Sequence, residues 1–224
     1  MSSRSVLVVA AHADDEVLGC GGTIAKHVEA GDAVSVCFMT DGVGARAQGH
    51  REATERQLAA KAALAELGVT QLEQHAFPDN QMDTVSCLSL TKIIEAAVQR
   101  NRPDIVYTHH SGDLNVDHRA THEAVMTALR PQPGTHTATI LTFEVMSSTE
   151  WRAPSPASTF APDWYVDIAD FLELKMAALG HYQAEMRAWP HARSMQAVEH
   201  LARYRGACVG VAAAEGFKLV RNIQ

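Results

Sequence analysis

The sequence predicts an α/β protein with a Rossmann-like, mostly parallel sheet that is covered by helices on both faces. Apolar runs alternate four times with segments of helical spacing, and the first run, Val6–Ala11, is almost continuously apolar. A continuous apolar run is typical of a strand that is buried on both faces. Such alternation favours parallel strands joined by right-handed crossover helices. The 224 residues fit a single domain, 1–224.

The four strand–helix units follow one another from the N-terminus. We expect strands at 6–11, 33–39, 71–77 and 105–108, and helices at 17–30, 51–67, 86–100 and 118–130. Gly31 and Gly68 stand where two of these helices should end. Asp117 opens the last helix, where a negative charge interacts favourably with the helix dipole.

The pattern changes after Pro131. We expect strands at 137–146 and 164–168, helices at 170–179 and 195–211, and a surface loop rich in Ser, Pro and Ala at 148–162. The core sheet then spans about 5–145, and the strands and helices of about 146–224 pack on it. The 148–162 loop and the loop at 42–49 are expected to shape a substrate pocket.

Composition excludes several classes of function. The net charge of −7 argues against non-specific nucleic-acid binding, which needs a basic face. No apolar run approaches the roughly 20 residues of a membrane span, and the polar start, 2–5, does not resemble a secretory signal. We therefore expect a cytoplasmic protein. The four cysteines form no C-x-x-C pair, so we expect reduced and mostly buried thiols.

Two polar clusters stand directly after predicted strands. His12, Asp14, Asp15 and Glu16 follow the first strand, and a second cluster runs from His109 to His118 after the fourth. In a doubly wound sheet the first and fourth strands can be neighbours at the switch point, where both clusters would face one crevice. Two imidazoles and a carboxylate, with a position left open for water, form a common catalytic zinc shell.

Other interpretations of these clusters explain less. The glycines at 19, 21 and 22 do not complete G-x-G-x-x-G, because position 24 is Ile, and nearby carboxylates would repel a pyrophosphate. Asp14, Asp15 and Asp41 would suit Mg²⁺ and phosphoryl transfer, but the imidazoles favour a softer metal such as zinc. Helix capping accounts for one aspartate only.

The run His12-Ala-Asp-Asp-Glu16 and the Gly-rich turn after it resemble the A-H-x-D-D-E signature of the PIG-L/LmbE-like family of zinc-dependent N-acetylglucosaminyl de-N-acetylases. The pair Asp117-His118 is a second specific match, and supporting matches extend the resemblance over roughly 5–220. It implies an enzyme that hydrolyses the acetyl amide of an N-acetylated amino sugar or its conjugate, with zinc or another divalent metal. Family members are often oligomeric, and a homo-oligomer remains open here.

By motif, the resemblance implies that His12, Asp15 and His118 ligate the metal and that Asp14 is the general base. Many members read H-P-D-H at the second cluster, where the first histidine stabilises the oxyanion. This chain has Asn115 there, which donates a hydrogen bond but carries no positive charge. Asn115, His109 and His110 therefore remain alternative oxyanion donors.

The remaining candidates have supporting roles. Asp117 is grouped with the catalytic residues, and Asp41, Arg56 and Asp113 are expected near the substrate, Asp113 also as a residue that orients an imidazole. His122, Arg205 and Glu215 are expected in the scaffold or behind the metal ligands. Two other functions stay open: a metal-dependent hydrolase of another bond, such as a different N-acyl amide or a phosphoester, and a non-catalytic sugar- or nucleotide-binding protein.

Overall fold

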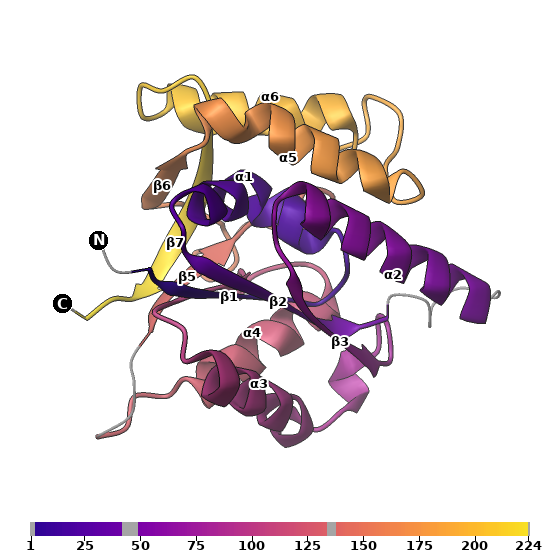
Figure 1. Ribbon diagram of the computed structural model, residues 1–224, viewed down its shortest axis with the longest axis vertical. Coiled ribbons are helices and arrows are strands. Elements are labelled where there is room, and N and C mark those ends of the chain that lie inside the picture. The colour runs from indigo at the N-terminus through magenta and orange to yellow at the C-terminus, as the bar shows by residue number, and fades with distance from the viewer. Residues whose placement is uncertain (1–2, 42–48, 134–137, 224) are drawn as a thin grey trace.

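A computed structural model describes residues 3–41, 49–133 and 138–223. Across these ranges one seven-stranded sheet has the order β3-β2-β1-β4-β5-β7-β6 (Figure 1). Its strands are β1 (Ser5–Ala10), β2 (Ala33–Thr40), β3 (Gln71–Phe77), β4 (Ile105–His109), β5 (Thr139–Phe143), β6 (Trp164–Asp167) and β7 (Ala214–Arg221).

The sheet is parallel over most of its width. β1 pairs in parallel with both β2 and β4, and the same direction continues into β3 on one side and β5 on the other. Only β7 runs against its two neighbours, β5 and β6. The predicted fold class is confirmed, and β1 and β4 are adjacent at the point where the strand order reverses.

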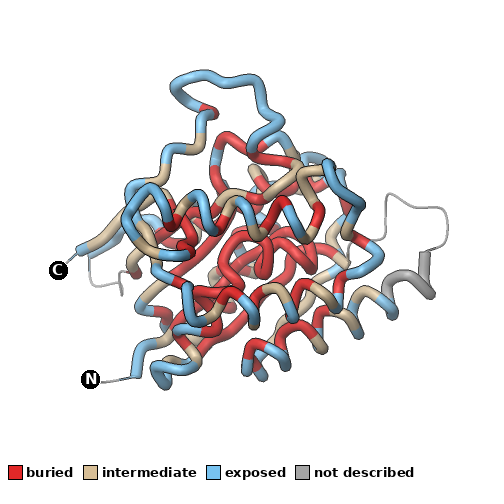
Figure 2. The backbone as a smooth tube through the Cα atoms, turned by 90° about the horizontal axis from the view of Figure 1, so that it is seen from above, coloured by how far each residue is buried: buried red, intermediate tan, exposed pale blue. Residues whose placement is uncertain are grey.

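Helices cover both faces of the sheet. On one face lie α1 (Asp15–Glu29), α2 (Gly49–Glu66), α5 (Leu172–Leu179) and α6 (Met195–Ala207), and on the other α3 (Cys87–Asn101) and α4 (Val116–Ala128) (Figure 1). Alternate residues of β1 enter the two cores: Val6 and Val8 pack toward the first group of helices, and Leu7 and Val9 toward the second. Buried segments accordingly fill the centre of the molecule (Figure 2).

Sequence reasoning missed β7 and misjudged some exposures. β7 carries Glu215, Lys218 and Arg221 within eight residues, so no apolar run marks it as a strand.

The expected surface loop at 148–162 begins with buried residues and contains a short 3₁₀ helix, Thr149–Trp151. Two of the four cysteines, Cys87 and Cys208, are exposed rather than buried. The expected pocket loop at 42–49 lies almost wholly outside the described residues. Among the helices that are described, none has the length and apolarity needed to span a bilayer.

Helix α1 is broken at Cys20, whose φ of −148° and ψ of 25° are not helical. The break leaves main-chain groups unbonded on both sides. After it, the N–H groups of Gly22 and Thr23 donate to the Glu215 carboxylate at 3.0 and 2.7 Å. Before it, the Leu18 carbonyl accepts a hydrogen bond from Lys175 Nζ at 2.9 Å. Lys175 and Glu215 themselves form a buried ion pair of 2.6 Å, so one pair satisfies both ends of the break.

The packing around Gly19 leaves no room for a side chain. A Cβ atom at this position would lie 2.3 Å from the ring of Phe143, which is fully buried. We expect Gly19→Ala to lower the free energy of unfolding by about 1–3 kcal/mol through overpacking. Gly180→Ala is the matched control, because nothing lies within 4 Å of its added methyl group. Urea denaturation of the two variants checks this, and equal stabilities would contradict it.

Candidate metal centre and active site

The two polar clusters meet at the carboxyl edge of the sheet. His12 follows β1 by two residues, and Asp15 is the first residue of α1. His118 lies in the first turn of α4, which follows β4. Because β1 and β4 are parallel neighbours, their carboxyl ends lie side by side and bring these three side chains together.

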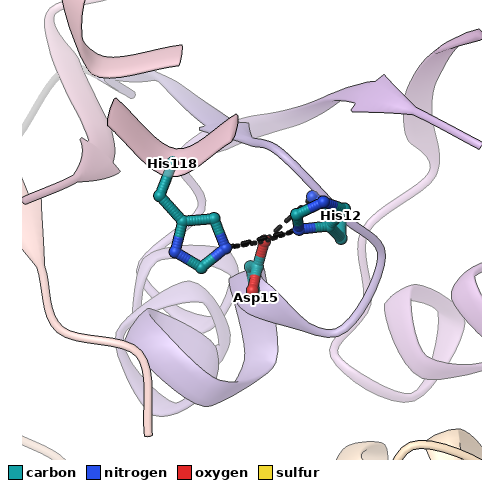
Figure 3. A group of neighbouring side chains, drawn as sticks. All are labelled: His12, Asp15 and His118. Atoms are coloured by element: carbon teal, nitrogen blue, oxygen red, sulfur yellow. Dashed lines mark hydrogen bonds and ion pairs between the residues drawn. The ribbon is translucent and has the colours of Figure 1, made fainter. Parts of the chain in front are cut away.

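The three side chains converge on a single carboxylate oxygen (Figure 3). Asp15 Oδ2 lies 3.2 Å from His12 Nδ1 and 3.3 Å from His118 Nε2. The two imidazole nitrogens are themselves 3.3 Å apart. His12 is 6 % exposed, and Asp15 and His118 are each 1 % exposed. The result is a compact set of two nitrogens and one oxygen that is shielded from water.

These donors fit a divalent metal ion. Two imidazoles and one carboxylate match the ligands of catalytic zinc sites, which leave a further position for water or substrate. The second oxygen of Asp15, Oδ1, is buried and has no hydrogen-bond partner in the described structure. A buried carboxylate oxygen without a partner is costly unless a cation or a water molecule satisfies it.

The other nitrogen of His12 is held by two further carboxylates. His12 Nε2 lies 3.0 Å from Asp117 Oδ2 and 3.1 Å from Asp79 Oδ1. Asp117 also accepts hydrogen bonds from the main-chain N–H groups of Asn80 and Met82, at 2.6 and 2.9 Å. The structure therefore places Asp117 behind His12, where it fixes the ring and directs Nδ1 at Asp15 and His118. His12, Asp79 and Asp117 form a second group with metal-ligand spacing, which shares His12 with the first.

Asp113 has the same relation to His118. Its Oδ1 atom lies 3.2 Å from His118 Nδ1. The carboxylate is fixed in turn by the hydroxyl groups of Ser148 and Thr149, the latter at 2.5 Å from Oδ2. Asp113 is fully buried, so it sits behind a candidate metal ligand. From the sequence, Asp113 was expected near the substrate and as a partner of an oxyanion-donor imidazole, His109 or His110; the structure places it against His118 instead.

The electrostatic field of the site attracts cations. Burial alone would lower the pKa of His118, but the Asp15 and Asp113 carboxylates outweigh it and raise the pKa to about 9. Burial also opposes the charge on His12, and Asp117, Asp15 and Asp79 raise its pKa well above the usual value. Burial alone would raise the pKa of Asp15, but the charges of His118 and His109 outweigh that effect and hold the pKa well below its usual range. Protons and a metal ion thus compete for the same nitrogens.

Metal binding should therefore release protons. The surrounding carboxylates raise the pKa of both imidazoles in the metal-free protein, that of His118 to about 9, so we expect Zn²⁺ binding at pH 7.5 to displace protons from them. The apparent Kd should rise as the pH falls. Calorimetric titration in buffers of different ionisation enthalpy measures the protons released. Asp113→Asn, which removes a charge that raises the pKa of His118, should release fewer, and an absence of proton release would contradict this account.

Asp14 occupies a strained position between the strand and α1. Its φ of 123° is rare for a residue with a Cβ atom, and strain of this kind is often found at functional sites. Oδ2 accepts a hydrogen bond of 3.0 Å from Arg193 Nη1, whereas Oδ1 is buried without a hydrogen-bond partner in the described structure. Burial raises the pKa of Asp14, and the positive charge of Arg193 partly offsets that rise.

The three proposed oxyanion donors all have other partners. Asn115 caps α4: its Oδ1 accepts the Asp117 N–H at 2.8 Å, and its Nδ2 donates to Asn80 at 3.2 Å. His109 is fully buried and stacks on the His118 ring, and its Nε2 accepts the Ala11 N–H at 2.8 Å. His110 Nε2 lies 3.1 Å from the Ser158 carbonyl.

The remaining candidates lie at varying distances from the site. Arg56 comes within 3.9 Å of Asp14 Oδ1, and its guanidinium donates to the Ala13 carbonyl at 3.3–3.4 Å. Asp41 directly follows β2 and is partly buried. His122 lies behind the site, where its Nδ1 is 2.9 Å from the His109 carbonyl.

Sequence reasoning did not single out three residues that contact the site. Arg193 bonds to Asp14, Glu185 lies 3.5 Å from Arg56, and the Tyr182 hydroxyl donates to Glu16 at 2.6 Å. All three come from the segment between α5 and α6. The sequence pattern marked none of these three residues, so only their folded positions reveal a contribution to the site.

The chain is similar to known deacetylases. The family model described as PIG-L, GlcNAc-PI de-N-acetylase, matches residues 7–129. A diacetylchitobiose deacetylase from Thermococcus kodakarensis is 26% identical over 243 residues, covering 98% of this chain and 84% of the relative. A probable N-acetyl-α-D-glucosaminyl L-malate deacetylase 2 from Bacillus cereus is 27% identical over 193 residues, covering 83% of this chain and 85% of the relative.

A solved structure shows that the fold is not restricted to deacetylases. A 4-carboxy-2-hydroxymuconate hydratase from Pseudomonas putida aligns with a TM-score of 0.77 and 23% identity, covering 99% of this chain and 98% of the hydratase. The reaction must therefore be argued from the site rather than from the fold. The family model spans both polar clusters and more than half of the chain, and the chain belongs to the PIG-L family.

Proposed function

We propose that this protein is a metal-dependent hydrolase that removes the acetyl group from an N-acetylated amino sugar or its conjugate. The observation that carries the proposal is the buried group of His12, Asp15 and His118 beside a carboxylate, Asp14, one oxygen of which has no hydrogen-bond partner among the described residues. The family model and both deacetylase relatives, which act on N-acetylglucosamine compounds by name, support the substrate class. The two imidazoles favour zinc among the common divalent ions.

The residues of the chain divide the chemistry between them. His12, Asp15 and His118 would hold the metal, which when bound polarises the acetyl carbonyl and activates a water molecule. Asp14 Oδ1 would accept a proton from that water molecule while the water oxygen attacks the carbonyl carbon. As the C–N bond breaks, the same carboxyl group would return the proton to the nitrogen. Acetate and a free amine leave, and Asp14 ends as it began.

Other residues prepare these groups for reaction. Asp117 and Asp113 fix the rings of His12 and His118 through the nitrogens that face away from the metal. Arg56, which lies 3.9 Å from Asp14 Oδ1 and is only 11% exposed in its side chain, would contact the sugar. Burial of the whole group excludes bulk water, so the interactions of its charges are stronger than at the surface.

The test is turnover of a panel of N-acetylamino sugars: the free sugar, a glycoside, and nucleotide- and lipid-linked forms. We expect primary amine and acetate to appear in equal amounts, to disappear when a chelator removes the metal, and to return with added Zn²⁺. Matched phosphoesters without an N-acetyl group should release no phosphate. Bound metal without amine release from any panel member, or phosphate release instead, would contradict the proposal.

A further inference from the structure

The two oxygens of the Asp14 carboxylate have unequal surroundings. Oδ2 is fixed by the hydrogen bond from Arg193 Nη1 at 3.0 Å. Oδ1 has no hydrogen-bond partner in the described structure, and Arg56 Nη2 lies 3.9 Å from it. A carboxylate held by one oxygen presents the other in a defined direction, which is the arrangement a general base needs.

Arg193 is itself held in place. Its Nε atom donates to Ser147 Oγ at 2.9 Å, and its main-chain N–H donates to His191 Nδ1 at 3.0 Å. The Arg193 carbonyl accepts a hydrogen bond from the Arg187 N–H at 2.9 Å. The side chain is 19% exposed. A planar guanidinium bound at two of its nitrogens has little freedom to rotate, so it can fix the direction of its partner.

The segment 147–149, which contacts Arg193, also reaches the metal site. Ser147 contacts Arg193, and the next two residues, Ser148 and Thr149, donate their hydroxyl hydrogens to Asp113. Asp113 in turn lies against His118 Nδ1. Three consecutive residues therefore connect the support of the base to the support of a metal ligand. Through these contacts, the side chain that holds the base and the side chain that holds a candidate metal ligand share one support.

We infer that Arg193 is a positioning residue for the reaction, which sets the Asp14 carboxylate relative to the metal ligands through its bonds to Asp14 and Ser147. The inference rests on the proposed function. Arg193 acts through Asp14 and is not required to contact the substrate. Small displacements of a reacting group lower rates strongly, by about 10²-fold for 1 Å. Loss of Arg193 should therefore lower kcat and leave both KM and metal content nearly unchanged.

The kinetic experiment compares Arg193→Gln with Arg187→Gln. Arg187 is an exposed arginine in the same segment, and within the described residues its side chain bonds only to the carbonyls of Ala184 and Met186. We expect Arg193→Gln to lower kcat by about 10- to 100-fold, with wild-type zinc content and Tm. Arg187→Gln should match the wild type. Ser147→Ala should show a smaller loss in the same direction, and guanidinium ion should restore part of the activity of Arg193→Ala.

Several kinetic results would overturn the inference. One is a kcat for Arg193→Gln within twofold of the wild type, and another is a loss that follows zinc content or Tm. A rise in KM at constant kcat would make Arg193 a substrate contact instead. If the wild type releases no amine from any panel member, the proposed function fails by itself.

If the proposed function fails, the inference about Arg193 is still decided by crystal structures of the wild type and Arg193→Gln with Zn²⁺ bound. We expect the Asp14 carboxylate to change orientation in the variant. An unchanged Asp14 would contradict the inference whether or not the enzyme turns over the panel.

Discussion

Asp14→Asn is expected to abolish most of the amine release while leaving zinc content unchanged. The amide keeps the size of the carboxylate but cannot accept a proton, and a positioned general base contributes about 10²–10⁴-fold to a rate. Asp14 is not among the three residues whose ligand atoms converge, so its replacement should not remove the metal. The measurement is kcat for the best panel substrate together with zinc per protomer.

Asp83→Asn is the control for Asp14→Asn. Asp83 is exposed in the short 3₁₀ helix Met82–Thr84, near Asp117 in the fold but outside the site. This variant should have the kcat and zinc content of the wild type. Unchanged turnover in Asp14→Asn would remove Asp14 from the mechanism. Loss of zinc along with turnover would instead make it part of the metal site.

Glu215→Ala should cost about 3–5 kcal/mol in the free energy of unfolding. The change leaves Lys175 buried without its anionic partner, and the two N–H groups after the break in α1 lose their acceptor. Glu215→Gln should cost less, because an amide oxygen still accepts from Gly22 and Thr23. Urea denaturation at pH 7.5 gives both values.

An exposed ion pair gives the comparison for Glu215→Ala. Glu199 and Arg203 lie four residues apart on α6, with side chains 41% and 55% exposed. Glu199→Ala should change stability by at most about 0.5 kcal/mol, because water screens the pair. If Glu215→Ala were no more harmful than Glu199→Ala, the break in α1 would not depend on the buried pair. The first half of α1 carries Asp15, so the metal site depends on the same support.

The metal-ligand cluster was predictable because its signal is local. His12 and Asp15 follow an abrupt end to an apolar run, and His118 stands at the same point after the fourth strand. The alternation of strands and helices allowed the first and fourth strands to be neighbours, and the structure brings the three side chains together. The choice of these three residues within the two clusters came from the family resemblance.

Glu215 was expected in the scaffold, but the contacts that support the site were not predictable, because they join distant parts of the chain. Arg193 bonds to a residue 179 positions away, and Glu215 to one 193 positions away. A lone arginine in an irregular segment looks like any surface cation. Glu215 lies in a strand that lacks an apolar run, and its partner Lys175 is an ordinary helical lysine by sequence.

Asn115 shows a different limit. The sequence marked it as a departure from the family pattern, but asparagine is also a preferred helix N-cap. The structure places its side-chain oxygen on the N–H of Asp117, two residues on. Sequence alone does not separate these roles, because a cap and a substrate donor use the same amide group.

The central claim is that a metal ion lies among His12, Asp15 and His118, and its most direct test is the position of the ion. We would grow crystals with Zn²⁺ and record anomalous scattering at the zinc edge. The account predicts one strong peak bounded by His12 Nδ1, the Asp15 carboxylate and His118 Nε2, and its loss in His118→Ala. A peak among His12 Nε2, Asp79 and Asp117, or no peak at saturating zinc, would contradict it.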